Sequence, residues 1–235
     1  MKLLRKNTEL WNFLSLMLLI VSIVIFVEGC KKENNTPPFS LIKTQTSNGT
    51  FTVTFSYDAQ NRITNIASNT GQRTSYLYNG NYITYIDSDG SNITIIHSVL
   101  NNRGLTEVSW TENSGDTLHW TYDVNGHNIG IAANHSNEIK TWLNDNLEND
   151  YNAGFSDTTN YAYTYYSGKE SSLTNSNYGR QFEGVDSKNL IQTETYTFNG
   201  IFTTQYSYEY DTYGRVSKRT GQANGITSQE TFTYY

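Results

Sequence analysis

Cys30 is the residue whose chemistry is best defined by its surroundings, because it is the only cysteine and it follows a long apolar run. The run covers residues 10–27, is preceded by the basic segment of residues 1–6, and is followed by the small residue Gly29. A basic start, an apolar middle and a small residue at the cleavage point are the parts of a secretory signal. A run of this length could also span a bilayer as an uncleaved helix. The single cysteine excludes an internal disulfide.

The four residues Val27-Glu28-Gly29-Cys30 resemble the lipobox of bacterial lipoproteins, in which the cysteine thiol is acylated and the chain is then cut before the cysteine. Glu28 departs from that pattern, which has a small or neutral residue at this position. The resemblance implies a signal peptide over residues 1–29, lipobox positions at Val27 and Gly29, and a lipid on Cys30. Residues 30–38 are then the acylated cysteine and a short tether.

The segment Lys31-Lys32-Glu33 resembles the start of mature lipoproteins of the Bacteroidota that are exported to the cell surface. Together with the lipobox it implies an outer-membrane protein that faces the periplasm or the cell surface. The protein would then be attached to the membrane through the lipid on Cys30.

The histidines do not have the spacing of a metal site. His97, His119, His127 and His135 form no close pair of the H-x-H or H-E-x-x-H type, so no metal is expected. Residues 87–92 carry oxygen ligands at alternate positions, as in a calcium loop, but lack the downstream bidentate glutamate, which favours a hairpin turn. No G-x-S-x-G elbow or Walker loop is present. We therefore predict no catalytic residue and no cofactor.

Two tryptophans are candidates for glycan binding. Trp110 and Trp120 lie close in sequence to Glu107, Glu112 and Asp116, and exposed aromatic side chains stack on sugar rings. A tryptophan on a strand can equally belong to the core, so both interpretations stay open.

Two short motifs resemble the O-glycosylation sites of exported Bacteroidota proteins. They are Asp116-Thr117-Leu118 and Asp157-Thr158-Thr159, and the resemblance implies modification at Thr117 and Thr158.

The composition favours strands and argues against a nucleic-acid partner. Aromatic residues make up 14% of the chain, with 19 tyrosines and 10 phenylalanines, and such side chains suit a pleated sheet. The net charge is −6, and no stripe of lysine and arginine is present to neutralise phosphates.

Alternation with a period of two residues organises the chain from residue 39 onward. In residues 51–57 aromatic and aliphatic side chains alternate with hydroxylic ones, and similar short runs follow at intervals that end in Gly and Asn turns. We expect an all-β domain over residues 39–235, an antiparallel meander of about a dozen or more short strands that forms a barrel-like or strongly curved sheet. Residues 138–143 fit a strand or a short helix, and residues 144–152 fit a loop.

Three stretches share the form aromatic, any residue, Tyr, Asp, two residues, Gly or Asn, basic residue. They begin at Phe55, Trp120 and Tyr208. The form predicts a hairpin in which the aspartate accepts hydrogen bonds from the turn backbone and Gly or Asn takes the left-handed position. It resembles the YD repeats of RHS-type proteins, with His127 in place of arginine as a departure. Together with the lipobox it resembles a Bacteroidota lipoprotein family of unknown function whose domain is described as porin-like, over about residues 51–235.

Three functions are compatible with these features. The first is a non-catalytic, lipid-anchored β-domain that binds a glycan or an envelope protein or has a structural role. The second is a hydrolase that acts on glycans at the cell surface. The third is a small outer-membrane barrel, against which the short strands and their hydroxylic second face argue, because membrane strands need about 9–11 residues and an apolar band.

Overall fold

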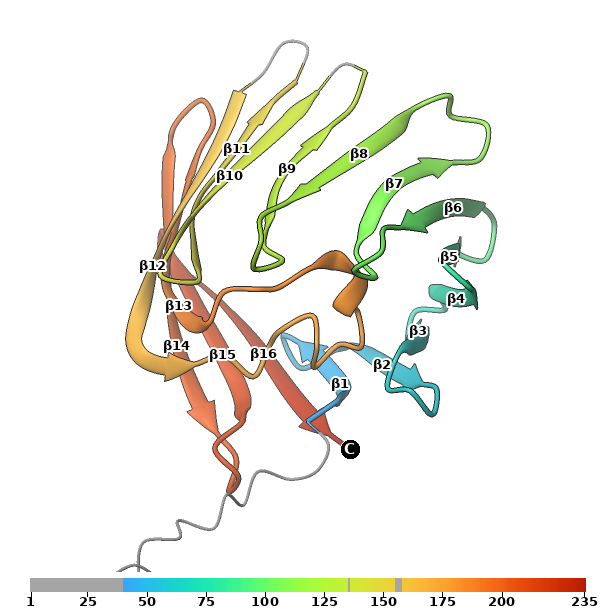
Figure 1. Cartoon of the computed structure of the whole chain (residues 1–235). Coiled ribbons are helices and arrows are strands. Elements are labelled where there is room, and N and C mark those ends of the chain that lie inside the picture. The colour runs from blue at the N-terminus through green and yellow to red at the C-terminus, as the bar shows by residue number, and fades with distance from the viewer. Residues whose placement is uncertain (1–39, 135, 155–157) are drawn as a thin grey trace, which may run out of the picture. The chain divides into compact units, whose positions relative to one another are not determined.

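The strands pair in sequence order into one antiparallel sheet, and β16 pairs with β1 to close it into a barrel (Figure 1). The computed structural model describes residues 40–134, 136–154 and 158–235. The predicted signal peptide, Cys30, the tether and His135 lie outside the described residues. Within the described ranges no helix is long and apolar enough to cross a membrane. The predicted all-β meander is confirmed, and the described residues form sixteen strands.

The strands are five to thirteen residues long. They are β1 (Ile42–Ser47), β2 (Phe51–Tyr57), β3 (Ile63–Ser68), β4 (Arg73–Asn79), β5 (Tyr82–Ser88), β6 (Ile93–Leu100), β7 (Thr106–Thr111), β8 (Thr117–Tyr122), β9 (Asn128–Ala132), β10 (Asn137–Leu143), β11 (Asn146–Ala153), β12 (Thr158–Glu170), β13 (Asn189–Thr197), β14 (Ile201–Tyr210), β15 (Val216–Ala223) and β16 (Ile226–Tyr234).

The prediction of a loop at residues 144–152 is wrong, because β11 occupies most of this range and pairs with β10. The two-residue turn between them is made by Asn144 and Asp145, which have φ angles of 52° and 61°. Charged residues stand at alternate positions of this hairpin, where other strands carry aromatic or aliphatic ones. Lys140 pairs directly with Asp150, for example. The apolar alternation that marks a strand is therefore missing from the sequence.

The connection between β12 and β13 crosses the interior of the barrel (Figure 1). We call residues 171–188 the plug; they include the short 3₁₀ helix η1 (Gln181–Glu183). Phe182 of the plug packs against Tyr76, Tyr78 and Tyr85 of the wall. Backbone bonds join the plug to distant strands, since Asn177 O accepts from Ile42 N at 2.9 Å and Gly179 O from Ile63 N at 3.0 Å. The plug thus joins β1, β3, β4 and β5 of the wall through the barrel interior.

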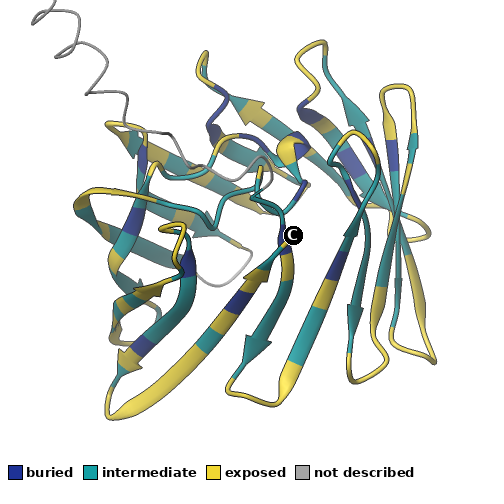
Figure 2. Ribbon diagram, turned by 90° about the horizontal axis from the view of Figure 1, so that it is seen from below, coloured by how far each residue is buried: buried dark blue, intermediate teal, exposed yellow. Residues whose placement is uncertain are grey.

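The buried core surrounds the plug at one end of the barrel. It consists of Ile42, Phe55, Ile63, Ile83, Phe182, Leu190, Val216 and Phe232. Elsewhere the sheet is mostly half-buried or exposed, and Figure 2 shows the buried residues as short bands along the strands. A barrel of this size therefore builds its apolar core from the wall and the plug together.

The hairpins that contain Tyr-Asp have the predicted geometry. Asp58 Oδ1 accepts from the backbone N–H groups of Gln60 and Arg62, and Asn61 adopts the left-handed conformation with φ 61°. The turns at Asp123 and Asp211 make the equivalent bonds. Because alternate turns of a meander lie at the same end, all three are at the plug end of the barrel.

The register assigns the inner and outer faces of the wall. Tyr76 and Tyr78 contact the plug, so their face of β4 is the inner one, and side chains directly opposite on neighbouring strands share a face. Following the pairs around the barrel places mainly tyrosine, tryptophan and charged residues inside. The outer face of the strands beside the closure is hydroxylic, with Thr44 bonded to Thr233 and Thr46 to Thr52.

Candidate functional site

The two candidate tryptophans lie on opposite faces of the wall. Trp120 points inward and its Nε1 donates to Ser109 Oγ at 3.0 Å. Trp110 lies on the outer face, where it pairs with His97 and the two ring centroids are 5.3 Å apart. They therefore cannot contribute to one binding surface, and the predicted pairing of Trp110 with Trp120 in a glycan site gains no support from the geometry.

The described histidines lie apart from one another. His97 Nε2 is 2.9 Å from Glu112 Oε1 on the outer face, and His119 lies opposite Val108 and Ala132 on that same face. His127 alone is buried. Within the residues that the structure describes, no group of His, Cys, Asp and Glu could hold a metal ion.

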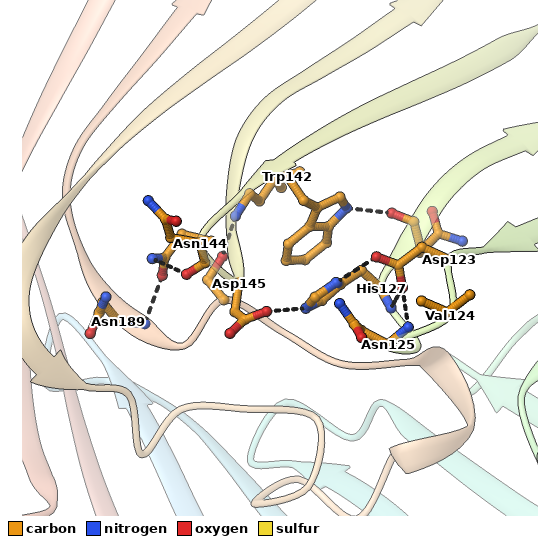
Figure 3. Close-up of polar contacts among 12 residues, drawn as sticks. Asp123, Val124, Asn125, His127, Trp142, Asn144, Asp145 and Asn189 are labelled. Carbon is orange, nitrogen blue, oxygen red and sulfur yellow. Dashed lines mark hydrogen bonds and ion pairs between the residues drawn. The ribbon is translucent and has the colours of Figure 1, made fainter.

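His127 is the centre of a polar cluster at the plug end, shown in Figure 3. Its Nδ1 is 2.9 Å from Asp123 Oδ2 and its Nε2 is 3.8 Å from Asp145 Oδ1. The imidazole stacks on Trp142, with centroids 4.4 Å apart and planes 20° from parallel. Trp142 Nε1 in turn donates to Asn128 O at 2.7 Å. The cluster locks two hairpins together, with His127 taking the place that arginine has in the other two Tyr-Asp turns.

A pocket of about 660 Å³ opens beside this cluster, between the hairpin turns and the plug. Its lining includes His127, Asp145, Asp186 and Lys188. Burial raises the pKa of Asp186, while the backbone N–H of Asn175, which donates to its carboxylate, lowers it. His127, Asp145 and Asp186 thus already have partners, and the backbone N–H of Lys188 donates to Asp145 O at 2.9 Å. These contacts hold the plug against the hairpin turns.

Farther from the plug, the inner wall carries a different arrangement. One register row crosses five adjacent strands from β10 to β14, and we call it the lumen row. Its members, in order, are Lys140, Asp150, Tyr161, Tyr196 and Phe202. The row combines a charged half with an aromatic half on one continuous inner surface.

The charged half of the lumen row includes a carboxylate with a shifted pKa. Burial raises the pKa of Asp150 to about 6; Lys140 acts against this, and the neighbouring Glu138 carboxylate adds to it. Lys140 Nζ contacts Glu138 and lies 3.8 Å from Asp150 Oδ2. Two acids therefore share one lysine, which favours a proton on Asp150 up to mildly acidic pH.

The barrel interior beyond the plug is open to solvent. Arg180 and Glu183 of the plug keep 31% and 32% of their side-chain surface exposed, although burial among surrounding groups raises the pKa of Glu183. On the wall, Arg219 Nε donates to Glu230 Oε2 at 2.6 Å, and the Arg219 side chain is 30% exposed. Side chains that point inward yet remain this exposed line a hollow space.

The predicted modification sites are at the ends of strands. Thr117 begins β8 and is half-buried, and Thr158 begins β12 and is exposed. Both modifications stay predictions.

The residues of the lumen row were not singled out by the sequence. A signal was present in Tyr161-Ala162-Tyr163 and Tyr196-Thr197-Phe198, where aromatic residues alternate with small or hydroxylic ones. The alternation shows that the aromatic residues share a face, but the pairing of β12 with β13 decides which rings meet.

The fold and its interior define this protein as a plugged antiparallel β-barrel. Among solved structures it is similar to a porin-like protein from Bacteroides uniformis, with a TM-score of 0.67 over 85% of this chain and 98% of that one. The sequences are 18% identical, so the likeness establishes the barrel fold alone. No protein-family model matches the sequence, and no curated protein matches it.

Proposed function

We propose that this protein is a lipid-anchored component of the cell envelope whose barrel is a non-catalytic binding domain, with the ligand held inside the barrel. The observation that carries the proposal is the distribution of side chains over the wall. Aromatic and charged residues point into a hollow interior, and the plug occupies one end. Ligand sites are typically concave, with aromatic walls and a few convergent polar groups.

The outer face supports a barrel that lies beside the membrane rather than across it. A membrane-spanning barrel needs an apolar band around its whole circumference. Here the outer residues of β13 to β16, β1 and β2 are largely hydroxylic, and hydroxyl pairs such as Thr164–Thr193 and Thr195–Thr203 run across the strands. Exposed apolar outer residues are found on part of the circumference only, on β4 to β6 (Leu77, Tyr82, Ile93) and on β10 and β11 (Ile139, Leu143, Tyr151). The lipid on Cys30 is then what holds the barrel at the outer membrane, on its periplasmic or its outer surface.

The anchor is tested by Cys30→Ser in the full-length chain. We expect the wild-type protein to incorporate labelled fatty acid, to be cut before residue 30 and to enter the membrane fraction. The variant should lose the label and the cleavage, whereas Asn34→Ser in the tether should behave as the wild type. A Cys30→Ser protein that is still cut and still membrane-bound would refute the anchor.

The outer face is tested separately with a chain that begins at Phe39. We expect this chain to be soluble and folded without detergent, because its barrel has a polar outer face. A requirement for detergent would instead support a membrane-spanning barrel.

A glycan-acting hydrolase is the second candidate. The raised pKa of Asp150, beside the carboxylate of Glu138, is the feature of a general acid that favours it. If the protein is such an enzyme, incubation with neutral hexasaccharides releases shorter products, and Asp150→Asn abolishes the release. The binding function predicts no product from either protein.

A further inference from the structure

The aromatic half of the lumen row is a continuous run of contacting rings. The ring centroids of Tyr161 and Tyr196 are 4.9 Å apart, and those of Tyr196 and Phe202 are 6.4 Å apart. The planes of Tyr161 and Tyr196 are tilted by 34°, and those of Tyr196 and Phe202 are stacked at 29° from parallel. Phe202, the last ring of the run, is 48% exposed. One aromatic face is therefore left open toward the rim away from the plug.

The hydroxyl groups of this region differ from those nearer the plug. The tyrosines that donate to a backbone carbonyl include Tyr57, Tyr78, Tyr165, Tyr208 and Tyr234. Among the residues described, none bonds to the hydroxyls of Tyr161, Tyr163 and Tyr196, and these oxygens are not among the buried atoms that lack a partner. These hydroxyl groups can therefore bond to a ligand that enters the barrel.

The charged half supplies groups that bind sugar hydroxyls. Carboxylates accept and a lysine ammonium donates, so Asp150 and Lys140 together can serve both sides of a hydroxyl group. Glu194, which pairs with Tyr163, adds a further acceptor, and Tyr206 donates to it at 3.2 Å. Acids outnumber bases on this surface, which disfavours an anionic ligand.

We propose that the lumen row is a binding site for a neutral oligosaccharide, with one sugar ring on the open face of Phe202 and the next ones along the edges and hydroxyl groups of Tyr196 and Tyr161 toward Asp150. The apolar face of a pyranose ring packs on an aromatic ring, and its equatorial hydroxyls meet the tyrosine hydroxyls and the carboxylate. This inference rests on the proposed binding function and adds the class of ligand. It places the candidate glycan site on β10 to β14, while sugar binding at Trp110 or Trp120 stays a prediction.

The test uses isothermal titration of the full-length lipoprotein in detergent micelles with three neutral probes: maltohexaose, cellohexaose and mannohexaose. We expect at least one probe to bind. Tyr196→Leu and Asp150→Asn should each weaken the binding of that probe by about tenfold, since each removes one stacking or hydrogen-bonding partner. Tyr151→Leu is the matched control, because Tyr151 lies next to Asp150 on β11 but is 41% exposed on the outer face.

Thermal unfolding of each variant shows whether the barrel is intact, and Phe202→Ser at the exposed rim repeats the test without touching the core. The inference is overturned if no probe binds the wild type. It is also overturned if Phe202→Ser and Tyr196→Leu bind as tightly as Tyr151→Leu, or if basic peptides bind and the sugars do not. In all three cases, the proposed anchor and water-facing barrel are judged independently by the Cys30→Ser and Phe39 experiments.

Discussion

Phe182 of the plug stacks on Tyr85 of β5, with ring centroids 5.9 Å apart and planes 27° from parallel. Phe182 is 5% exposed and also meets Tyr76 and Tyr78, so it joins the plug to two strands of the wall. The connection between β12 and β13 is therefore a part of the core rather than a surface loop.

Phe182→Ala should lower the free energy of unfolding by about 3–5 kcal/mol, because it removes a buried ring and leaves a cavity between plug and wall. Urea unfolding measures this loss. Val185→Ala in the same plug is the control, since Val185 is 47% exposed and its truncation should cost less than about 1 kcal/mol. Equal losses for the two variants would mean that the plug does not depend on this ring.

Gly184 lets the plug lie against the wall. Its φ is +103°, and a Cβ there would be 2.7 Å from Gly126 O and 2.8 Å from the ring of Tyr122. Gly184→Ala should therefore cost about 3 kcal/mol, from backbone strain plus overlap. Gly168→Ala isolates the first contribution, because Gly168 has φ +69° and open space around it. Its expected cost is about 1–2 kcal/mol in the same thermal or urea melt. If Gly184→Ala and Gly168→Ala lose the same unfolding free energy, the plug does not fit closely against the wall at Gly184.

The strands and the Tyr-Asp turns were predictable because each depends on neighbours in sequence. Alternation places Phe51, Val53 and Phe55 on one face whatever they pair with. The bonds of Asp58 to Gln60 and Arg62 lie within a single turn. The plug was not predictable in the same way. Its anchors, Phe182 and Gly184, follow no period, and their partners are more than fifty residues away.

The lumen row also depends on information that the sequence does not display. Tyr161 and Tyr196 meet because β12 pairs with β13 in one register, and a slip of one residue would send one of the rings to the outer face. The β10–β11 hairpin was missed for a related reason. Its inner positions hold Lys140 and Asp150, whose charges satisfy each other only after the strands have paired.

The turn at Asp211 should make a pH-dependent contribution to stability. Asp211 Oδ1 accepts from the backbone N–H groups of Tyr213 and Arg215 at 2.9 Å, and Oδ2 accepts from Arg215 Nε at 2.7 Å. Burial alone would raise the pKa of Asp211, but the hydrogen bonds from Arg215 and Tyr213 outweigh this effect. The pKa in the folded state therefore lies below its ordinary value of 3.8. The stabilisation is thus fully present above pH 3.8 and is lost as the pH falls through the lowered pKa of the folded state.

Asp211→Ala should cost about 1–3 kcal/mol at pH 7, because two backbone donors and a guanidinium lose their acceptor. Asp211→Asn should cost less, since the amide oxygen can still accept the backbone bonds. The exposed Asp116→Ala is the control and should change stability little. Urea melts at pH 7 and below pH 4 measure both effects. A loss at Asp211 that is the same at the two pH values would contradict the role of its ionised form.

Asp150 should have the opposite pH dependence. Burial raises its pKa to about 6 from an ordinary 3.8, so between these values the folded state binds a proton that the unfolded state has lost. Its contribution is then greatest below pH 3.8 and declines as the pH rises through about 6. At neutral pH the wild-type barrel holds two carboxylates, Asp150 and Glu138, against the single charge of Lys140.

Asp150→Asn removes one of these charges and keeps the size of the side chain. We expect the variant to be at least as stable as the wild type at pH 7, and its unfolding free energy to decline less between pH 4 and pH 7. Urea melts across this range measure the difference, with Asp116→Asn as an exposed control that should follow the wild-type profile. The same substitution is expected to weaken sugar binding, so a gain in stability together with a loss of affinity would mark Asp150 as a residue kept for its ligand at a cost in stability. Parallel pH profiles for wild type and variant would show instead that Asp150 is already ionised in the folded barrel at acidic pH.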